Sequence, residues 1–257
     1  MIDQSIYERI VSFSSLATLS SIQYSDYDDL KDCEVLVDHE SLKVLYRTQG
    51  VRPVIEYVSI GVEPLFNYLK DHSISGVLHF VPDEMIPMLE SIGFSVLAQF
   101  TDFFCNPLVD NYPSESVSIE LAVASDAQRL AEISQKCVGI SRGFFGETEA
   151  WFKEWMSEHP VLVIKEHGQI IGLCCVSVYN EGTTLWIREM CVDPVYQRQG
   201  VGNQLMKAAI KYGVSQGCIK SFLAVDVENH SAIRIYQSYG FTHRDNSVET
   251  HMVRNQT

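Results

Sequence analysis

The sequence has few basic residues and no long apolar run, and each lack excludes a class of protein. Of its 257 residues, 19 are Lys or Arg and 33 are Asp or Glu, which gives a formal net charge of −14. Nucleic acids and anionic membrane surfaces attract basic proteins, so we expect neither as a partner. No apolar run approaches the ~18 residues that a membrane-spanning helix needs, so we expect no membrane span.

The seven cysteines do not form the pairs that disulfide frameworks and zinc sites require. No two of them are spaced as Cys-x-x-Cys, and most lie within apolar segments. The N-terminus also lacks a basic region followed by an apolar core, so no secretory signal peptide is expected. The sequence therefore predicts a reduced, cytoplasmic protein that holds no metal.

What the sequence does contain is a glycine-bearing motif, Gln197-Arg198-Gln199-Gly200-Val201-Gly202. An apolar segment at residues 185–192 precedes the motif, and apolar residues at helical spacing follow it as far as Tyr212. Glycines let the backbone approach a ligand closely, and the free N–H groups in the first turn of a helix attract anions. The motif therefore predicts a site for a phosphate group, in particular a pyrophosphate.

The residues around this motif exclude the common nucleotide-binding loops. No Gly-Lys-Ser/Thr follows the glycines, so a P-loop is not expected. The Rossmann fingerprint needs three glycines early in the fold and an acidic residue roughly 20 positions further on, and that pattern does not fit here. Spacing alone leaves two interpretations open, a phosphate loop of another type and a surface turn.

A second motif decides between these interpretations. Residues 222–227 are typical of a strand, Asn229 or Ser231 can begin a helix, and Gly240 suits the left-handed residue that ends it. The two motifs together resemble the GCN5-related N-acetyltransferase (GNAT) superfamily. Its hallmarks are (Arg/Gln)-x-x-Gly-x-(Gly/Ala) after the fourth strand and Asn-x-x-Ala-x-x-x-Tyr-x-x-x-Gly-Phe after the fifth. The resemblance covers roughly residues 117–245.

The resemblance implies an α+β fold with a mixed sheet, the acyl-CoA N-acyltransferase fold, and acetyl-CoA as co-substrate. In this family the fourth and fifth strands part, and the acyl arm of the coenzyme lies between them. A bulge near Met190 commonly presents an N–H to the thioester carbonyl, where it stabilises the oxyanion that forms as the amine attacks. The residues implied in coenzyme binding are Cys191, Val192, Gln197, Arg198, Gln199, Gly200, Val201, Gly202 and Asn229.

Two residues are the candidates for catalysis. The resemblance places Tyr236 near the sulfur, where a phenol can protonate the departing thiolate as a general acid; packing of its ring in the core is the alternative. Glu189 is the carboxylate best placed in the sequence to serve as general base, directly or through water. It is equally suited to be a structural partner of Arg188, and a bulge leaves open which sheet face it occupies. Ala224 stands where some members of the family carry a base.

The loop between the first two helices usually sets acceptor selectivity in this family. Here that region is rich in aromatic residues, and two interpretations stay open: an aromatic-walled amine pocket, since rings attract cations, or ordinary core packing. The residues concerned are Phe144, Phe145, Trp151, Phe152 and Trp155.

The first 116 residues form an additional segment, because a single domain of this family needs about 140–160 residues. Gly93-Phe94 repeats Gly240-Phe241 at an offset of 147 positions (240 − 93), and at that offset Leu89 stands where Tyr236 does. We therefore expect a degenerate, non-catalytic GNAT-like domain at 1–116 and a catalytic one at 117–257, joined by a turn-rich linker at 110–116. Residues 1–116 carry 6 Lys and Arg against 18 Asp and Glu, so nearly all of the net charge lies there.

The expected function is transfer of an acetyl group from acetyl-CoA to a primary amine by direct attack in a ternary complex. The acceptor is a small-molecule or a protein amine, and a homodimer is possible; the sequence identifies neither the amine nor the oligomeric state. Two alternatives remain: a non-catalytic acyl-CoA-binding sensor or regulatory module, and a binding module for another phosphate ligand. The intact Tyr236 disfavours the first, and the missing Lys and acidic ribose partner disfavour the second.

Overall fold

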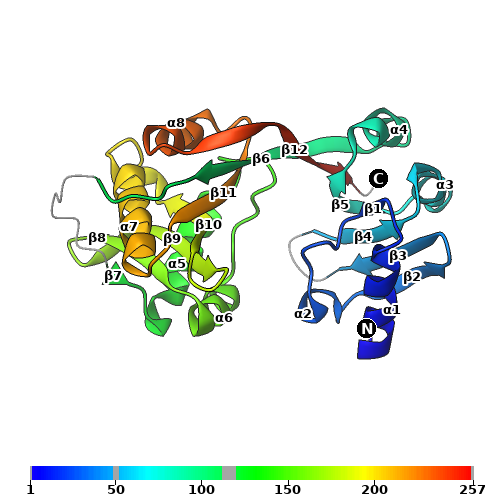
Figure 1. Cartoon of the computed structure of the whole chain (residues 1–257), viewed down its shortest axis with the longest axis horizontal. Coiled ribbons are helices and arrows are strands. Elements are labelled where there is room, and N and C mark those ends of the chain that lie inside the picture. The colour runs from blue at the N-terminus through cyan, green and yellow to red at the C-terminus, as the bar shows by residue number, and fades with distance from the viewer. Residues whose placement is uncertain (1, 49–51, 112–119, 256–257) are drawn as a thin grey trace. The chain divides into compact units, whose positions relative to one another are not determined.

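The computed structural model describes residues 2–48, 52–111 and 120–255. The chain divides into two compact units, here called unit 1 (Met1–Gln99 and Glu249–Thr257) and unit 2 (Phe100–Val248). Figure 1 shows the elements of each unit. Two strands, β6 (Ser95–Cys105) and β12 (Thr242–Arg254), begin in one unit and end in the other.

These limits differ from the boundary expected between residues 116 and 117. Residues 100–105 belong to unit 2 because they pair with a strand of its sheet, and residues 250–254 belong to unit 1 because they pair with a strand of its sheet. The expected linker at 110–116 lies mostly outside the described residues. The assignment of a degenerate and a catalytic half stays a prediction.

Unit 1 is a sheet with helices on its faces. Its strand order is β2-β3-β4-β5-β12, with β1 paired to β4; among its described pairings, β4 with β5 is parallel and the others are antiparallel. Its strands are β1 (Leu19–Ser20), β2 (Glu34–His39), β3 (Leu42–Arg47), β4 (Val54–Ser59) and β5 (Gly76–Val81). Its helices are α1 (Gln4–Ser14), α2 (Tyr27–Leu30), α3 (Val62–His72), the 3₁₀ turn η1 (Asp83–Met85) and α4 (Ile86–Glu90).

Unit 2 has the strand order β6-β11-β10-β9-β8-β7, in which β10 and β11 are parallel and the other strand pairs that the structure describes are antiparallel. Its further strands are β7 (Glu120–Leu121), β8 (Val161–Glu166), β9 (Gln169–Tyr179), β10 (Thr184–Val192) and β11 (Lys220–Asp226). Its helices are η2 (Ala124–Asp126), α5 (Ala127–Lys136), α6 (Glu149–Glu158), η3 (Pro194–Tyr196), α7 (Val201–Ser215) and α8 (His230–Ser238). This mixed sheet with flanking helices confirms the expected fold class.

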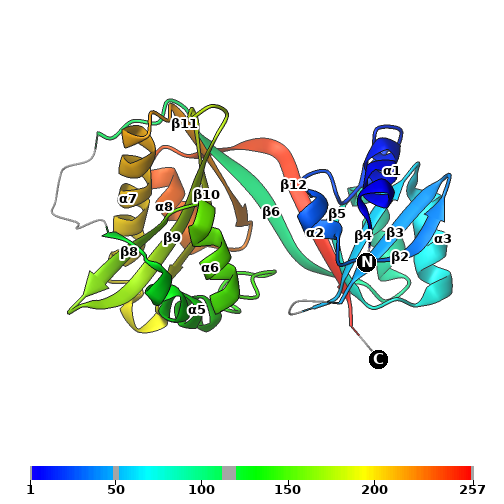
Figure 2. The same ribbon diagram turned by 90° about the horizontal axis from the view of Figure 1, so that it is seen from below.

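Helices cover both faces of the sheet of unit 2, as Figure 2 lets the reader follow. Leu130 and Phe152, from α5 and α6, pack in one core with Leu173 of β9. Leu205 of α7 packs in a separate core with Leu185 of β10. The period-2 alternation of β9 and β10 supplies apolar side chains to both cores, which explains why most residues of β9 are buried and those of β10 are buried or half-buried.

Two glycines allow α7 to lie close against the sheet. A Cβ added at Gly213 would lie 2.8 Å from Leu185 Cδ2, and one at Gly172 would lie 3.0 Å from side-chain atoms of both Val201 and Leu205. The contact at Gly172 holds the first turn of α7 against β9. Within the described ranges, no helix is both long and apolar enough to cross a membrane.

Candidate active site

The parallel strands β10 and β11 part after three residue pairs. Thr184 to Trp186 pair with Lys220 to Phe222; beyond them β11 stays paired to β6 as far as Asp226, and β10 stays paired to β9 as far as Val192. In the part of the chain that the structure describes, the second half of β10 therefore has a partner on one side only. An unpaired strand edge offers N–H and C=O groups to another extended chain.

A β-bulge lies at Arg188 in β10, two residues before the position expected from the sequence. Ile187 pairs with Val176 and Glu189 pairs with Cys175, so Arg188 has no partner on β9. The extra residue shifts the alternation of side chains. Ile187 and Met190 consequently pack in the α7 core, whereas Glu189 turns to the α5 and α6 face.

The carboxylate of Glu189 is buried and hydrogen-bonded. Ser134 Oγ donates to Glu189 Oε1 at 2.9 Å, Cys191 Sγ donates to the same oxygen at 3.4 Å, and Arg188 Nη1 lies 3.7 Å from Oε2. Burial raises the pKa of Glu189, and the hydrogen bond from Ser134 and the charge of Arg188 offset only part of that rise. The geometry therefore accommodates both interpretations of Glu189, a base and a structural partner of Arg188.

Arg188 connects this carboxylate to α6 and its preceding loop. Its guanidinium donates to Glu147 Oε1 at 3.2 and 3.3 Å, and lies 4.3 Å from the ring centre of Trp151. The N–H of Glu147 donates in turn to Ser134 Oγ at 2.9 Å. Ser134, Glu147, Arg188 and Glu189 thus form one hydrogen-bonded network, and sequence spacing gave no sign of Ser134 or Glu147.

The glycine motif forms the turn between η3 and α7. Arg198 and Gly200 have positive φ angles of 59° and 84°, and Gly200 is the N-cap of α7. Gln204 is the first residue whose N–H reaches the carbonyl of Gly200, at 3.1 Å, so the N–H groups of residues 201–203 have no intrahelical acceptor. A Cβ added at Gly200 would meet nothing within 4 Å, which leaves open space above the turn.

Side chains of the motif stabilise the turn itself. Gln197 Nε2 donates to the carbonyl of Val192 at 3.1 Å, and Gln199 Nε2 donates to that of Val195 at 3.0 Å. The side chain of Val201 is buried, while Arg198 is exposed. Free N–H groups, open space and an exposed cation suit a pyrophosphate, because each favours a negatively charged ligand.

Tyr236 of α8 lies in the core beside both parted strands. Its ring contacts that of Phe103, which pairs with Leu223 of β11, and it lies close enough to Cys191 of β10 for that thiol to influence its pKa. The residue is 8% exposed, and burial raises the pKa of the phenol. No residue in the described ranges hydrogen-bonds its hydroxyl.

The remaining coenzyme candidates have clear structural positions. Cys191 and Val192 lie on the part of β10 that has no partner on its β11 side. Asn229 is the N-cap of α8, and its Oδ1 accepts from the N–H of Ala232 at 3.2 Å. Asn229 is therefore needed for helix capping whether or not it contacts a ligand.

The structure also contains an ion pair that sequence spacing does not reveal. Asp226, 1% exposed at the end of β11, accepts from the N–H of Arg142 at 2.8 Å and from its Nη2 at 2.7 Å. Burial alone would raise the pKa of Asp226, but the hydrogen bonds from Arg142 and from the N–H of Glu228 hold it below its usual value. This ion pair fixes the α5–α6 loop against the end of β11, the strand that separates from β10.

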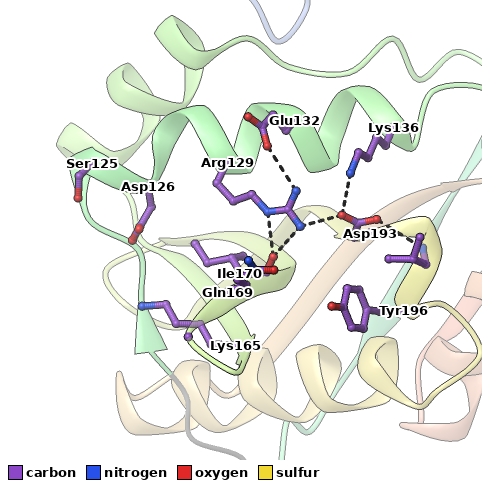
Figure 3. A pocket seen from close by; sticks show the side chains of 12 residues that line it. Ser125, Asp126, Arg129, Glu132, Lys136, Lys165, Gln169, Ile170, Asp193 and Tyr196 are labelled. Atoms are coloured by element: carbon purple, nitrogen blue, oxygen red, sulfur yellow. Dashed lines mark hydrogen bonds and ion pairs between the residues drawn. The ribbon is translucent and has the colours of Figure 1, made fainter.

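A polar cavity of about 560 Å³ lies beside α5, the β8–β9 hairpin and η3. Figure 3 shows Asp193 between Arg129 and Lys136, at 2.7 and 3.1 Å. Arg129 also donates to the carbonyl of Ile170 at 2.9 Å. Arg129 and Lys136 are already paired with Asp193, and these ion pairs fix the residue that follows β10. The cavity is therefore a weaker anion site than the turn at Gly200.

Comparison with known proteins agrees with this geometry. Residues 122–241 match the family model of the acetyltransferase (GNAT) family. A mycothiol acetyltransferase from Saccharopolyspora erythraea is 28% identical over 103 residues, which cover 40% of this chain and 33% of the relative. A spermine/spermidine N(1)-acetyltransferase from Bacillus subtilis is 24% identical over 135 residues, which cover 49% of this chain and 88% of the relative. The chain thus spans about one third of the length of the mycothiol acetyltransferase that it matches.

The fold comparison extends over both units. A GNAT-family acetyltransferase from Colwellia psychrerythraea superimposes with a TM-score of 0.61 and 10% identity, covering 100% of this chain and 98% of that one. At this identity the likeness concerns the fold alone. Together with the parted strands and the helix-opening turn, the family match shows that residues 122–241 form a domain of the acetyltransferase (GNAT) family.

Proposed function

We propose that unit 2 transfers the acetyl group of acetyl-CoA to a primary amine while both substrates are bound. The observation that carries the proposal is the position of the free N–H groups of α7, at the end of the strand whose edge lacks a partner. A pyrophosphate at the turn and an extended arm along β10 use both features at once. Relatives that are acetyltransferases, one of them an N(1)-acetyltransferase of spermine and spermidine, support the same reaction.

In this proposal the coenzyme-binding residues contact two parts of coenzyme A, the pyrophosphate and the pantetheine arm. The N–H groups from Gln197 to Gly202 hold the pyrophosphate, aided by the α7 dipole and by the charge of Arg198. The backbone of Cys191 and Val192 pairs with the pantetheine arm as a further strand would, and Asn229 lies beside the arm. Coenzyme A, when bound, supplies the acetyl group as an activated thioester.

Tyr236 is proposed as the general acid. The amine nitrogen bonds to the acetyl carbon, the carbon–sulfur bond breaks, and the departing thiolate takes the phenolic proton. Because no residue in the described ranges hydrogen-bonds the Tyr236 hydroxyl, it is available to a group that is not part of the chain. A phenol is protonated at neutral pH, the state that an acid requires, and burial, which raises the pKa of Tyr236, preserves that state.

Glu189 is proposed as the base that takes a proton from the amine, directly or through water. It faces α5 and α6 beside the bulge at Arg188. A bulge frees backbone groups from the strand ladder, and an N–H freed there is suited to stabilise the oxyanion of the attacked carbonyl. No nucleophilic side chain is assigned, so the amine attacks the thioester directly.

The Tyr236→Phe variant tests this proposal by release of coenzyme A thiol in the presence of a panel of amines. We expect kcat to fall by ~10²-fold, because the thiolate loses its proton donor, with little change in affinity for acetyl-CoA. Tyr212→Phe on α7 is the matched control and should behave as the wild type. Unchanged turnover would remove Tyr236 from the mechanism. Acetyl-CoA binding without turnover of any amine would favour the alternative function, an acyl-CoA sensor.

A further inference from the structure

Four aromatic side chains form a continuous strip on the α6 side of the sheet in unit 2, within a larger aromatic group in which Tyr179 contacts Trp186 and Trp151 contacts Trp155. Phe104, Phe222 and Trp186 are register partners across β6, β11 and β10, with ring centres 6.5 and 6.0 Å apart, and Trp155 of α6 packs edge-on against Trp186 at 6.1 Å. All four are half-buried. These four residues are called the aromatic strip below.

The aromatic strip lies next to the residues of β10 at which the amine is proposed to react. Trp186 and Phe222 are the last pair before β10 and β11 part, and Arg188 and Glu189 follow along β10 toward the same helices. Two to three residues of strand span about 7–10 Å, the length of a ring with a short linker. A group bound on the strip can therefore place an attached amine beside Glu189.

The ring geometry favours an aromatic group over a cation. Trp186 and Phe222 stack with an angle of 8° between their planes, and Phe104 stacks on Phe222, so the rings turn their faces toward one another. Cations bind ring faces, whereas ring edges carry partial positive charge and attract the face of another ring. The guanidinium of Arg188 already lies over Trp151 and Trp155.

The charged residues near the aromatic strip also favour an aromatic acceptor over a polyamine. Glu147 is paired with Arg188, and Glu189 accepts from Ser134 and Cys191. A polyamine needs several carboxylates along its length, whereas the single amine of the proposed acceptor needs only Glu189, the proposed base. Phe152 is fully buried, so core packing alone explains why an aromatic residue stands there. The residues of the aromatic strip are only half-buried, so core packing does not fully explain them.

We propose that the aromatic strip binds the body of the acceptor, and that the acceptor is a primary amine carried on an aromatic ring by a short linker. The inference rests on the proposed acetyl transfer and names its substrate class. The strip residues determine specificity, and none of them touches the reacting atoms.

A matched pair of amines tests this substrate class. 2-Phenylethylamine and 2-cyclohexylethylamine differ only in whether the ring is aromatic, and kcat/KM is measured for both at saturating acetyl-CoA. We expect about a tenfold preference for the aromatic amine, the size of one good ring–ring contact. Phe222→Leu and Trp186→Leu should bring that ratio near one, with the KM for acetyl-CoA unchanged. Tyr212→Leu, on the opposite face, should leave the ratio as it is.

Binding supplies a readout that does not depend on turnover. Trp186 should report 2-phenylethylamine by quenching of tryptophan fluorescence in the coenzyme-saturated protein, and Phe222→Leu should weaken that binding by about tenfold. Equal kcat/KM for the two amines, a preference that survives both substitutions, or preferred use of spermidine or of a peptide N-terminus would overturn the inference. Absence of acetyl-CoA binding would instead overturn the proposed function itself.

Discussion

Glu189 illustrates what sequence reasoning could and could not predict for a single residue. Its place on β10 and its nearness to Arg188 were readable from the sequence. Its sheet face was not, because alternation holds only in the absence of a bulge, and the bulge at Arg188 depends on pairing with β9. Its contact with Ser134 joins residues 55 positions apart, which no local pattern reveals.

The same contact gives a prediction about pH. Ser134→Ala removes a hydrogen bond that favours the ionised carboxylate, so the pKa of Glu189 should rise further. A base acts only when deprotonated, and activity is therefore lost as pH falls through that raised pKa. The acid limb of kcat/KM should move to higher pH in Ser134→Ala.

Two further variants complete that experiment. Ser157→Ala on α6, whose hydroxyl donates only to the carbonyl of Glu154, is the control and should leave the profile unchanged. Glu189→Gln should lower kcat by at least ~10²-fold and remove the acid limb. An acid limb that stays in place in all three variants would mean that Glu189 is a structural partner of Arg188 and not the base.

At the scale of elements, periodicity predicted the strands and helices around the site well. The apolar segment at 185–192 lies within β10 (Thr184–Val192), and the strand expected at 222–227 corresponds to β11 (Lys220–Asp226), because apolar runs are local signals. Close contacts between elements were not predictable. The approach of α7 at Gly172 and the tie between Arg142 and Asp226 both join distant segments of the chain.

The turn before α7 allows a sharply controlled test of coenzyme binding. Gly200 and Gly217 both have positive φ, 84° and 88°, and a Cβ at either meets nothing within 4 Å. Alanine at each should lower the free energy of unfolding by a similar amount, about 1 kcal/mol, because an L residue is strained there. Only Gly200→Ala should weaken acetyl-CoA binding, by about tenfold, since its Cβ enters the space assigned to the pyrophosphate.

Calorimetric titration and thermal unfolding of both variants separate the two effects. Equal losses of stability together with unchanged affinity in Gly200→Ala would contradict the assignment of this turn. Weaker binding in both variants would show that the loss reflects general destabilisation and would equally count against it.

At the scale of the whole molecule, the two units share an order of strands. In unit 1, β3 and β4 are antiparallel, β4 and β5 are parallel, and β12 completes the row; in unit 2, β9, β10, β11 and β6 follow the same pattern. This likeness supports our proposal that unit 1 is a degenerate GNAT-like domain. At the sequence offset of 147 positions, Leu89 of α4 corresponds to Tyr236, and it has no proton to donate.

Of this likeness between the two units, the sequence reveals only one short repeat. Gly93-Phe94 repeats Gly240-Phe241 because both follow a short helix, and such local endings survive divergence. The strands after them, β6 and β12, each pair in the other unit's sheet, so unit 1 consists of two separate segments and unit 2 begins within β6 and ends within β12. Pairing between strands so far apart in the chain leaves no local signal, and the expected boundary at 116/117 therefore differs from the limits of the units.

Calorimetric titration of the purified full chain with acetyl-CoA, with ATP as the control ligand, tests the central claim most directly. The N–H groups at the start of α7 and the unpaired edge of β10 together predict micromolar binding of acetyl-CoA, because both its pyrophosphate and its pantetheine arm are bound. ATP has no such arm and should not bind measurably. Failure of acetyl-CoA to bind, or equal binding of ATP, would contradict the acetyltransferase account of this site.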